Sequence, residues 1–180
     1  MTPLNRVNPW LVLLGLSLGV LVTNGFGRFA YGLILPAMRA DLNWTYAQAG
    51  WLNTANAAGY VLGAVGTMVM VRRIAPGRLF VWGLVATVAA ILATGAIHAL
   101  WWQSLWRFAT GVAGALSFST AGTLAARLFA DNPRHNALGI AILFGSGGGG
   151  AIVLAGATLP PMLALHGDAA WPWAWVIVGT

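Results

Sequence analysis

The sequence predicts an all-α membrane protein, a bundle of helices that crosses a lipid bilayer several times. Of the 180 residues, 59% are hydrophobic and only 7% are charged. Soluble domains carry about 25% charged residues, so a soluble domain of this size would lack the side chains that face water. Long apolar stretches separated by short polar connections fill almost the whole chain. Lipid is therefore the expected solvent for most of the surface.

Five stretches are long enough to be complete transmembrane helices, because a crossing needs about 20 mostly apolar residues. They are residues 9–36, 46–71, 79–97, 101–126 and 137–160. A sixth begins near Trp171 and is still apolar at Thr180. At about 1.5 Å per residue this last stretch crosses only half of the hydrocarbon core. We therefore expect the chain to be truncated within the sixth helix.

Local signals mark where these helices begin, taken in order along the chain. Asn8 places a capping side chain before a proline, and the apolar run after it lacks a signal-peptide cleavage site, so we expect an uncleaved first helix. Thr45 and Gln48 form a capping-box pair before the second helix. A turn at residues 76–77 separates the second and third helices. Asn132 caps the fifth helix as Asn8 caps the first, and a polar connection at Asp168 precedes the sixth.

The basic residues predict how the chain is oriented in the membrane. All nine are arginines, and alternate connections divide them unequally. One set of connections holds Arg6, Arg72, Arg73, Arg78, Arg127 and Arg134, and the other holds Arg39 alone. Cytoplasmic loops carry the excess of Lys and Arg, so the N-terminus is expected in the cytoplasm. The expected location is the inner membrane of a bacterium. Because the arginines are scattered, the net charge of +6 does not indicate nucleic-acid binding.

Three of the predicted helices carry their polar residues on one stripe each. Polar groups in lipid are costly and normally face a bundle interior or a wet cavity. We interpret the stripes as walls of a substrate cavity, whose candidate residues are Asn24, Arg28, Tyr31, Asn53, Asn56, Tyr60, Gln103, Arg107 and Thr110. The alternative is that they only hydrogen-bond neighbouring helices, at about 0.6 kcal/mol each. The third helix is apolar on all sides, which predicts a peripheral position.

Glycines predict where helices approach each other closely. Small residues four apart form a ridge on the second helix, with Gly59 and Gly63, and on the fourth, with Gly111. The fifth helix contains a run of glycines, among them Gly145, Gly147, Gly148 and Gly149. Each glycine weakens an isolated helix by up to about 1 kcal/mol. We expect this run to be a place of tight packing or a hinge, with a binding loop as the alternative.

Two arginines lie inside predicted helices and need partners. A charge near the centre of a bilayer costs at least about 2.5–3.5 kcal/mol, and Arg28 and Arg107 have no carboxylate near them in the sequence. An anionic ligand would match their planar guanidinium groups. The alternative is that each reaches the membrane surface or binds carbonyl groups at a helix end. The chain has no cysteine, and we expect neither a metal nor a cofactor.

Several segments resemble the major facilitator superfamily, the MFS. Residues 107–114 (RFATGVAG) resemble the Arg-x-x-x-Gly motif of its fourth helix. Residues 66–78 resemble its loop motif, but without the usual Asp. The glycine-rich fifth helix is similar to an antiporter motif but lacks its Gly-Pro pair. Residues 25–32 (GFGRFAYG), 35–38 (LPAM) and 47–60 (AQAGWLNTANAAGY) resemble the YbfB/YjiJ-like transporters.

The resemblance implies that residues 1–180 are the N-terminal six-helix half of an MFS-type helical bundle. It implies a secondary active transporter that works by alternating access, with helices one and four lining the cavity. Its partners would be the lipid bilayer, a small-molecule substrate and a missing C-terminal half. The alternative is a truncated membrane fragment or interaction module that transports nothing. We do not expect an enzyme, because Ser146 lacks the glycine two residues before it that a nucleophile turn needs, and no histidine lies within a predicted helix.

Overall fold

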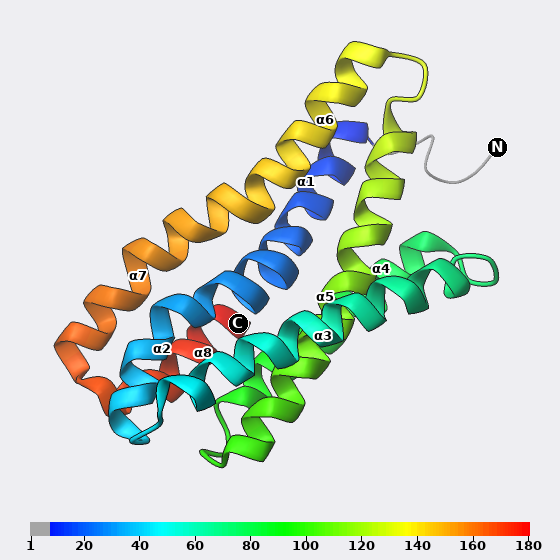
Figure 1. The fold of residues 1–180 in the computed structure, drawn as a ribbon. Helices are drawn as coiled ribbons and strands as arrows, with labels where there is room; N and C mark the ends of the chain where they lie inside the picture. Colours follow the sequence, from blue (N-terminus) through cyan, green and yellow to red (C-terminus); the bar gives the residue numbers. More distant parts are fainter. Residues whose placement is uncertain (1–7) are drawn as a thin grey trace.

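A computed structural model describes residues 8–180, and within that range the chain forms helices and short connections with no strand (Figure 1). Arg6, which contributed to the predicted orientation, lies outside the described residues. The elements are α1 Pro9–Val20, η2 Leu21–Phe29, α2 Ala30–Asp41, α3 Tyr46–Met70, α4 Pro76–Thr94, α5 Leu100–Leu128, α6 Pro133–Gly145, η3 Ser146–Gly150, α7 Ala151–His166, η4 Asp168–Ala170 and α8 Trp171–Gly179.

Two helices contain a π-helical segment and run further than the sequence predicts. The first is continuous over Pro9–Asp41 and the fifth over Pro133–His166. The expected ends at residues 36 and 160 were wrong, because Pro36 and Pro160 lie inside helices. Proline is tolerated in transmembrane helices, where neighbouring helices and local adjustments satisfy the backbone groups that it frees.

Among the described residues, three helices have both the length and the apolar composition to cross a membrane: Pro9–Asp41, Pro76–Thr94 and Pro133–His166. The helices α3 and α5 are long enough, at 25 and 29 residues, but carry more polar side chains. The helix α8 has 9 residues. The all-helical class is thus confirmed, whereas the count of five complete crossings stays a prediction.

The predicted caps are confirmed at three helix starts. Asn8 accepts a hydrogen bond from the Trp10 amide, and Asn132 accepts one from the His135 amide, each at 3.0 Å. Thr45 forms a capping box with Gln48 at the start of α3. The turn expected at residues 76–77 was wrong, because Pro76 is the first residue of α4. Proline suits the first position of a helix, because an N–H group there would have no partner within the helix.

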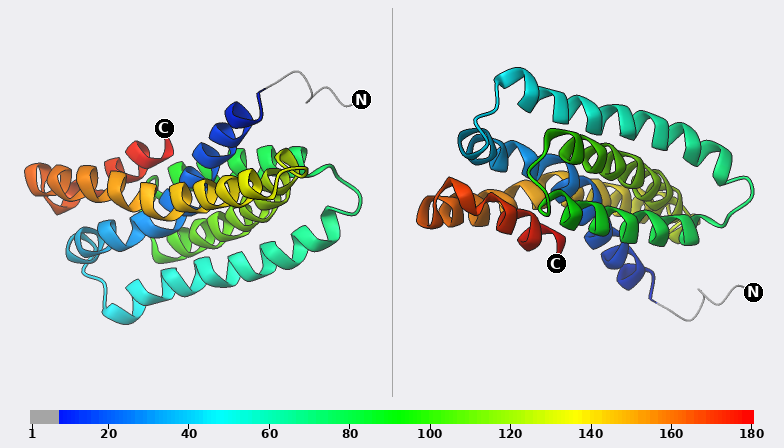
Figure 2. Two further views of the ribbon diagram at one scale, coloured as in Figure 1. Left: turned by 90° about the horizontal axis from the view of Figure 1, so that it is seen from above. Right: turned by 90° about the horizontal axis from the view of Figure 1, so that it is seen from below.

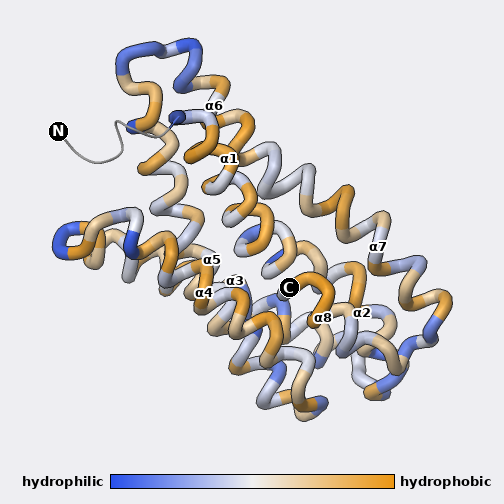
Figure 3. Tube along the Cα trace, turned by 180° about the vertical axis from the view of Figure 1, so that it is seen from behind, coloured by the Kyte–Doolittle hydropathy of each residue, from blue (hydrophilic) through white to orange (hydrophobic). Residues whose placement is uncertain are grey.

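Successive helices alternate in direction, so the connections gather at two ends of the bundle. The start of α1 and the α3–α4 and α5–α6 connections lie at one end, and the other connections lie at the opposite end (Figure 1). Figure 3 shows that the hydrophilic segments are concentrated in these connections, with apolar helices between them. Arg72 and Arg134 therefore lie at one end and Arg39 at the other, as the alternation along the sequence predicts.

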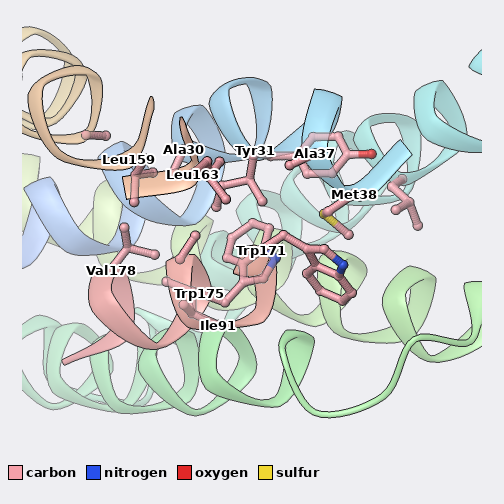
Figure 4. Packing of buried hydrophobic residues seen from close by; sticks show 14 of the residues in the cluster. Ala30, Tyr31, Ala37, Met38, Ile91, Leu159, Leu163, Trp171, Trp175 and Val178 are labelled. Carbon is pink, nitrogen blue, oxygen red and sulfur yellow. The ribbon is translucent and has the colours of Figure 1, made fainter. Parts of the chain in front are cut away.

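The helices α3 and α4 both pack against α5, and α3 lies at the edge of the bundle (Figure 2). The short helix α8 inserts two fully buried tryptophans, Trp171 and Trp175, between α2 and α4 (Figure 4). The Trp171 indole donates a hydrogen bond of 2.9 Å to Asp41 Oδ2 at the end of α2. This cluster fixes the position of α2, which carries part of the site described next.

Candidate functional site

A groove of about 400 Å³ opens between the first helix and α3. Its polar lining consists of Arg28, Tyr31 and Asn53. Phe29, Leu35 and four small residues, among them Gly32 and Gly50, complete the walls. A Cβ added at either glycine would meet no atom within 4 Å. The groove is therefore wide as well as polar, which suits the entry of a small molecule.

A narrow polar crevice extends the groove toward α5, where three helices meet. It is too narrow for a water molecule, and its lining includes Asn24, Arg28, Asn56, Tyr60 and Thr110. Together the groove and the crevice bring together seven of the nine predicted cavity residues. The other two, Gln103 and Arg107, line neither space.

Arg28 is the cation that faces the groove. Arg28 is exposed, and its guanidinium carbon lies 5.0 Å from the centre of the Tyr60 ring. A cation over an aromatic face is attracted by the negative face of the ring. This contact positions the guanidinium but leaves its N–H donors available, so Arg28 has the geometry to bind an anion in the groove.

Arg107 lies behind the groove, with only 1% of its surface exposed. One guanidinium nitrogen donates a hydrogen bond of 2.7 Å to the Gly27 carbonyl. The guanidinium carbon lies 4.7 Å from the centre of the Tyr31 ring and 5.5 Å from that of Trp175. Within residues 8–180, Nε and the second terminal nitrogen have no hydrogen-bond partner. Because Tyr31 touches Arg107 and also lines the groove, it connects the buried cation with the open space.

The π-helical segment η2 supplies both the exposed arginine and the carbonyl that binds the buried one. It contains Asn24, Gly27 and Arg28. Segments of this kind occur often at functional sites, where the wider turn re-aims backbone and side-chain groups. Its glycines let neighbours approach: a Cβ at Gly25 would collide with that of Ala151 in α7. The sequence analysis did not predict this segment, because no residue type specifies a π-helical turn.

Two of the predicted polar residues, Gln103 and Asn56, form hydrogen bonds between helices. Gln103 is fully buried, and its amide donates to the carbonyls of Thr94 and Ile97 at 2.6 and 2.7 Å, at the end of α4. Asn56 donates to the Arg107 carbonyl at 2.9 Å. The last four carbonyls of a helix lack helical partners, so Gln103 satisfies groups that lipid cannot. Gln103 thus has the geometry of a packing residue.

The comparison with known protein families identifies the kind of molecule that carries this site. A family model described as "Uncharacterised MFS-type transporter YbfB" matches residues 20–180. The chain belongs to this family. Searches of curated proteins and of solved structures gave no match. The all-helical fold and its apolar helices agree with a multi-pass membrane protein of the MFS.

In this MFS transporter, the glycines of α3 and α5 face the backbone of the opposite helix. A Cβ at Gly59 would collide with the Phe108 carbonyl oxygen. At Gly63 a Cβ would lie 2.5 Å from the Val112 carbonyl oxygen, and at Gly111 it would collide with the Asn56 carbonyl oxygen. Only glycine allows this spacing. The two helices thus form the closely packed wall behind the crevice.

The glycine run of the fifth helix behaves differently. It falls at the π-helical segment η3, Ser146–Gly150. A Cβ at Gly147 would collide with the Val20 side chain, but a Cβ at Gly145, Gly148 or Gly149 would meet no atom within 4 Å among the described residues. Tight packing therefore accounts for Gly147 and not for the other three, for which a role as a hinge remains a hypothesis.

We predict opposite stability effects for Gly147→Ala and Gly148→Ala. Gly147→Ala is expected to lower the thermal unfolding temperature, because its Cβ collides with Val20. Gly148→Ala is expected to raise it, because a helical alanine is favoured over glycine by about 1 kcal/mol where space is free. If flexibility at η3 serves transport, Gly148→Ala will also slow transport. Unchanged transport in a stabilised Gly148→Ala variant would count against the hinge.

Proposed function

We propose that the chain is part of a secondary active transporter that carries a small anionic molecule across the bacterial inner membrane by alternating access. The observation that carries this proposal is the exposed guanidinium of Arg28 in a groove of about 400 Å³. The groove and the crevice have no acidic residue in their lining. An unneutralised cation beside a polar groove favours an anionic substrate, since carboxylates and phosphates match the guanidinium plane.

The first helix and α3 form two walls of the groove. Alternating access operates between two helical halves of a transporter, with the substrate site between them. The opposite wall would come from a second helical half. We place the end with the α3–α4 and α5–α6 connections in the cytoplasm, because cytoplasmic loops collect arginine. Arg72, Arg73 and Arg134 lie at that end.

We propose no enzymatic activity for the chain. The Ser146 hydroxyl donates to the carbonyls of Leu143 and Ser17, at 2.8 and 3.3 Å. No histidine takes part in those hydrogen bonds, so Ser146 has the contacts of a packing residue. Treatment with a fluorophosphonate probe is expected to leave Ser146 unlabelled.

The proposal is tested with Arg28→Gln. The protein is reconstituted in liposomes, and uptake of a panel of labelled monocarboxylates, dicarboxylates and phosphate esters is measured beside neutral analogues. A hydrogen bond to a charged group contributes about 1.5–3 kcal/mol, so transport efficiency for the anion is expected to fall by about tenfold to a hundredfold.

Arg134→Gln is the matched control, because Arg134 is exposed in the first turn of α6 and outside the groove. It removes the same charge and is expected to transport at the wild-type rate. Equal transport by Arg28→Gln and Arg134→Gln would contradict the role of Arg28. Transport of neutral analogues alone would contradict the substrate class.

A further inference from the structure

We infer that a second pocket, at the end of the bundle with the α3–α4 connection, binds the phosphate headgroup of an anionic phospholipid. This pocket has a volume of about 450 Å³ and lies outside the groove. Its lining combines three arginines, Arg72, Arg73 and Arg127, with the hydroxyl-bearing residue Thr123. The inference concerns the interaction of the protein with its membrane and does not depend on the transported substrate.

The backbone holds the arginines of the pocket in place from two directions. Arg72 and Arg73 lie in a hydrogen-bonded turn after α3, where their amides donate to the carbonyls of Val69 and Met70 at 3.3 and 3.0 Å. Arg127 lies in the last turn of α5, one residue before the helix ends at Leu128. Arg127 on α5 and the two arginines of the turn therefore line one pocket from two elements of the structure.

No acidic residue in the lining of the pocket neutralises the positive charge of its three arginines. Of the three acidic residues in the chain, Asp131 lies at this end of the bundle, and it does not line the pocket. The lining also includes Ala75 and Pro76, at the start of α4, and no side chain caps that helix. The first turn of a helix carries a partial positive charge. All of these features favour an anion with several oxygen acceptors, as a phosphate has.

The surroundings favour a lipid over a soluble anion. Near the pocket, α3 exposes Met68 and Val69, and α4 exposes Val81 and Val85. Trp82 is also exposed, and the Arg78 guanidinium carbon lies 5.5 Å from the centre of its ring. Tryptophan and arginine together are typical of the membrane–water interface. A headgroup in the pocket would thus have apolar helix surface beside it for its acyl chains, and basic pockets between helices on the cytoplasmic side bind such headgroups.

The test compares two double variants that remove the same charge. Arg72→Gln/Arg127→Gln removes two arginines of the pocket, and Arg39→Gln/Arg134→Gln removes two that do not line it. The purified proteins are examined by native mass spectrometry in detergent with phosphatidylglycerol or phosphatidylcholine. Each basic residue near a lipid surface contributes about fivefold in affinity, so the pocket variant is expected to bind phosphatidylglycerol about 25-fold more weakly.

The control variant is expected to keep wild-type binding of phosphatidylglycerol, and phosphatidylcholine is expected to bind all three proteins weakly. Equal losses in both variants would overturn the inference, since binding would then follow net charge alone. Displacement of the lipid by millimolar inorganic phosphate would also overturn it and indicate a soluble anion. If the double variant fails to fold, as judged by thermal unfolding, the single variants Arg127→Gln and Arg134→Gln make the same comparison.

Discussion

Arg107→Met is expected to reduce transport at least tenfold while the amount of folded protein in the membrane stays the same. Arg107 is buried, and two of its three guanidinium nitrogens lack partners within residues 8–180. A buried donor without a partner costs about 1–3 kcal/mol. A conformation that pairs those donors would be favoured by a similar amount. Arg107 would therefore bias the equilibrium between conformations, and methionine, which fills a similar volume, removes that bias.

The same reasoning predicts that Arg107→Met does not destabilise the conformation described here. Replacing a buried charged group by an apolar side chain of similar volume is often neutral or stabilising. The thermal unfolding temperature in detergent is expected to stay level or to rise, whereas uptake into liposomes falls. The unfolding temperature and the uptake are measured on the same preparation of protein. Wild-type transport by Arg107→Met would contradict the assigned role, and so would a loss of transport explained by unfolding.

The second large effect is expected at the contact between α3 and α5. In Gly111→Ala, the new Cβ collides with the Asn56 carbonyl oxygen and lies 2.8 Å from the Tyr60 amide nitrogen. Both atoms belong to the backbone, so the two helices must separate. The hydrogen bond from Asn56 to the Arg107 carbonyl, 2.9 Å long, would lengthen with them. Overpacking of this kind costs about 1–3 kcal/mol, and more where the backbone cannot move.

Gly66→Ala on α3 is the matched control, because a Cβ at Gly66 would meet no atom within 4 Å. This substitution makes the same chemical change on the same helix pair and is expected to raise stability by up to about 1 kcal/mol. Thermal unfolding of the two variants in one detergent gives the comparison. Equal unfolding temperatures for Gly111→Ala and Gly66→Ala would show that the close contact does not limit stability.

Those features of the fold that depend on short stretches of sequence were predicted correctly. The apolar composition determines the helical class, because a chain in lipid must satisfy its backbone groups internally. The caps at Asn8, Thr45 and Asn132 depend on neighbouring residues only. The motifs at residues 25–32 and 107–114 indicated the family, which the match over residues 20–180 confirms.

The features that depend on distant residues were not predicted. A π-helical turn differs from an α-helical one by a single hydrogen-bond register, and no residue type specifies it. Trp175, which contacts Arg107, lies on α8, and the sequence analysis assigned that segment no role in the site. The position of Gln103 depends on where α4 ends, and the sequence analysis placed that end at residue 97 instead of Thr94. The polar stripes indicated which residues face inward, but not whether they face a groove or another helix.

The two π-helical segments lie against each other in the middle of the bundle. A Cβ at Gly147 in η3 would collide with Val20, the last residue of α1, and a Cβ at Gly25 in η2 would lie 2.9 Å from the Gly147 carbonyl oxygen. A π-helical turn contains one residue more than an α-helical turn. If that extra residue moves along the helix, the helical segment that it passes rotates by about 100° about the helix axis. Because a Cβ has no room at Gly25 or at Gly147, we expect a rotation of Arg28 about its helix axis to require a matching rotation of η3.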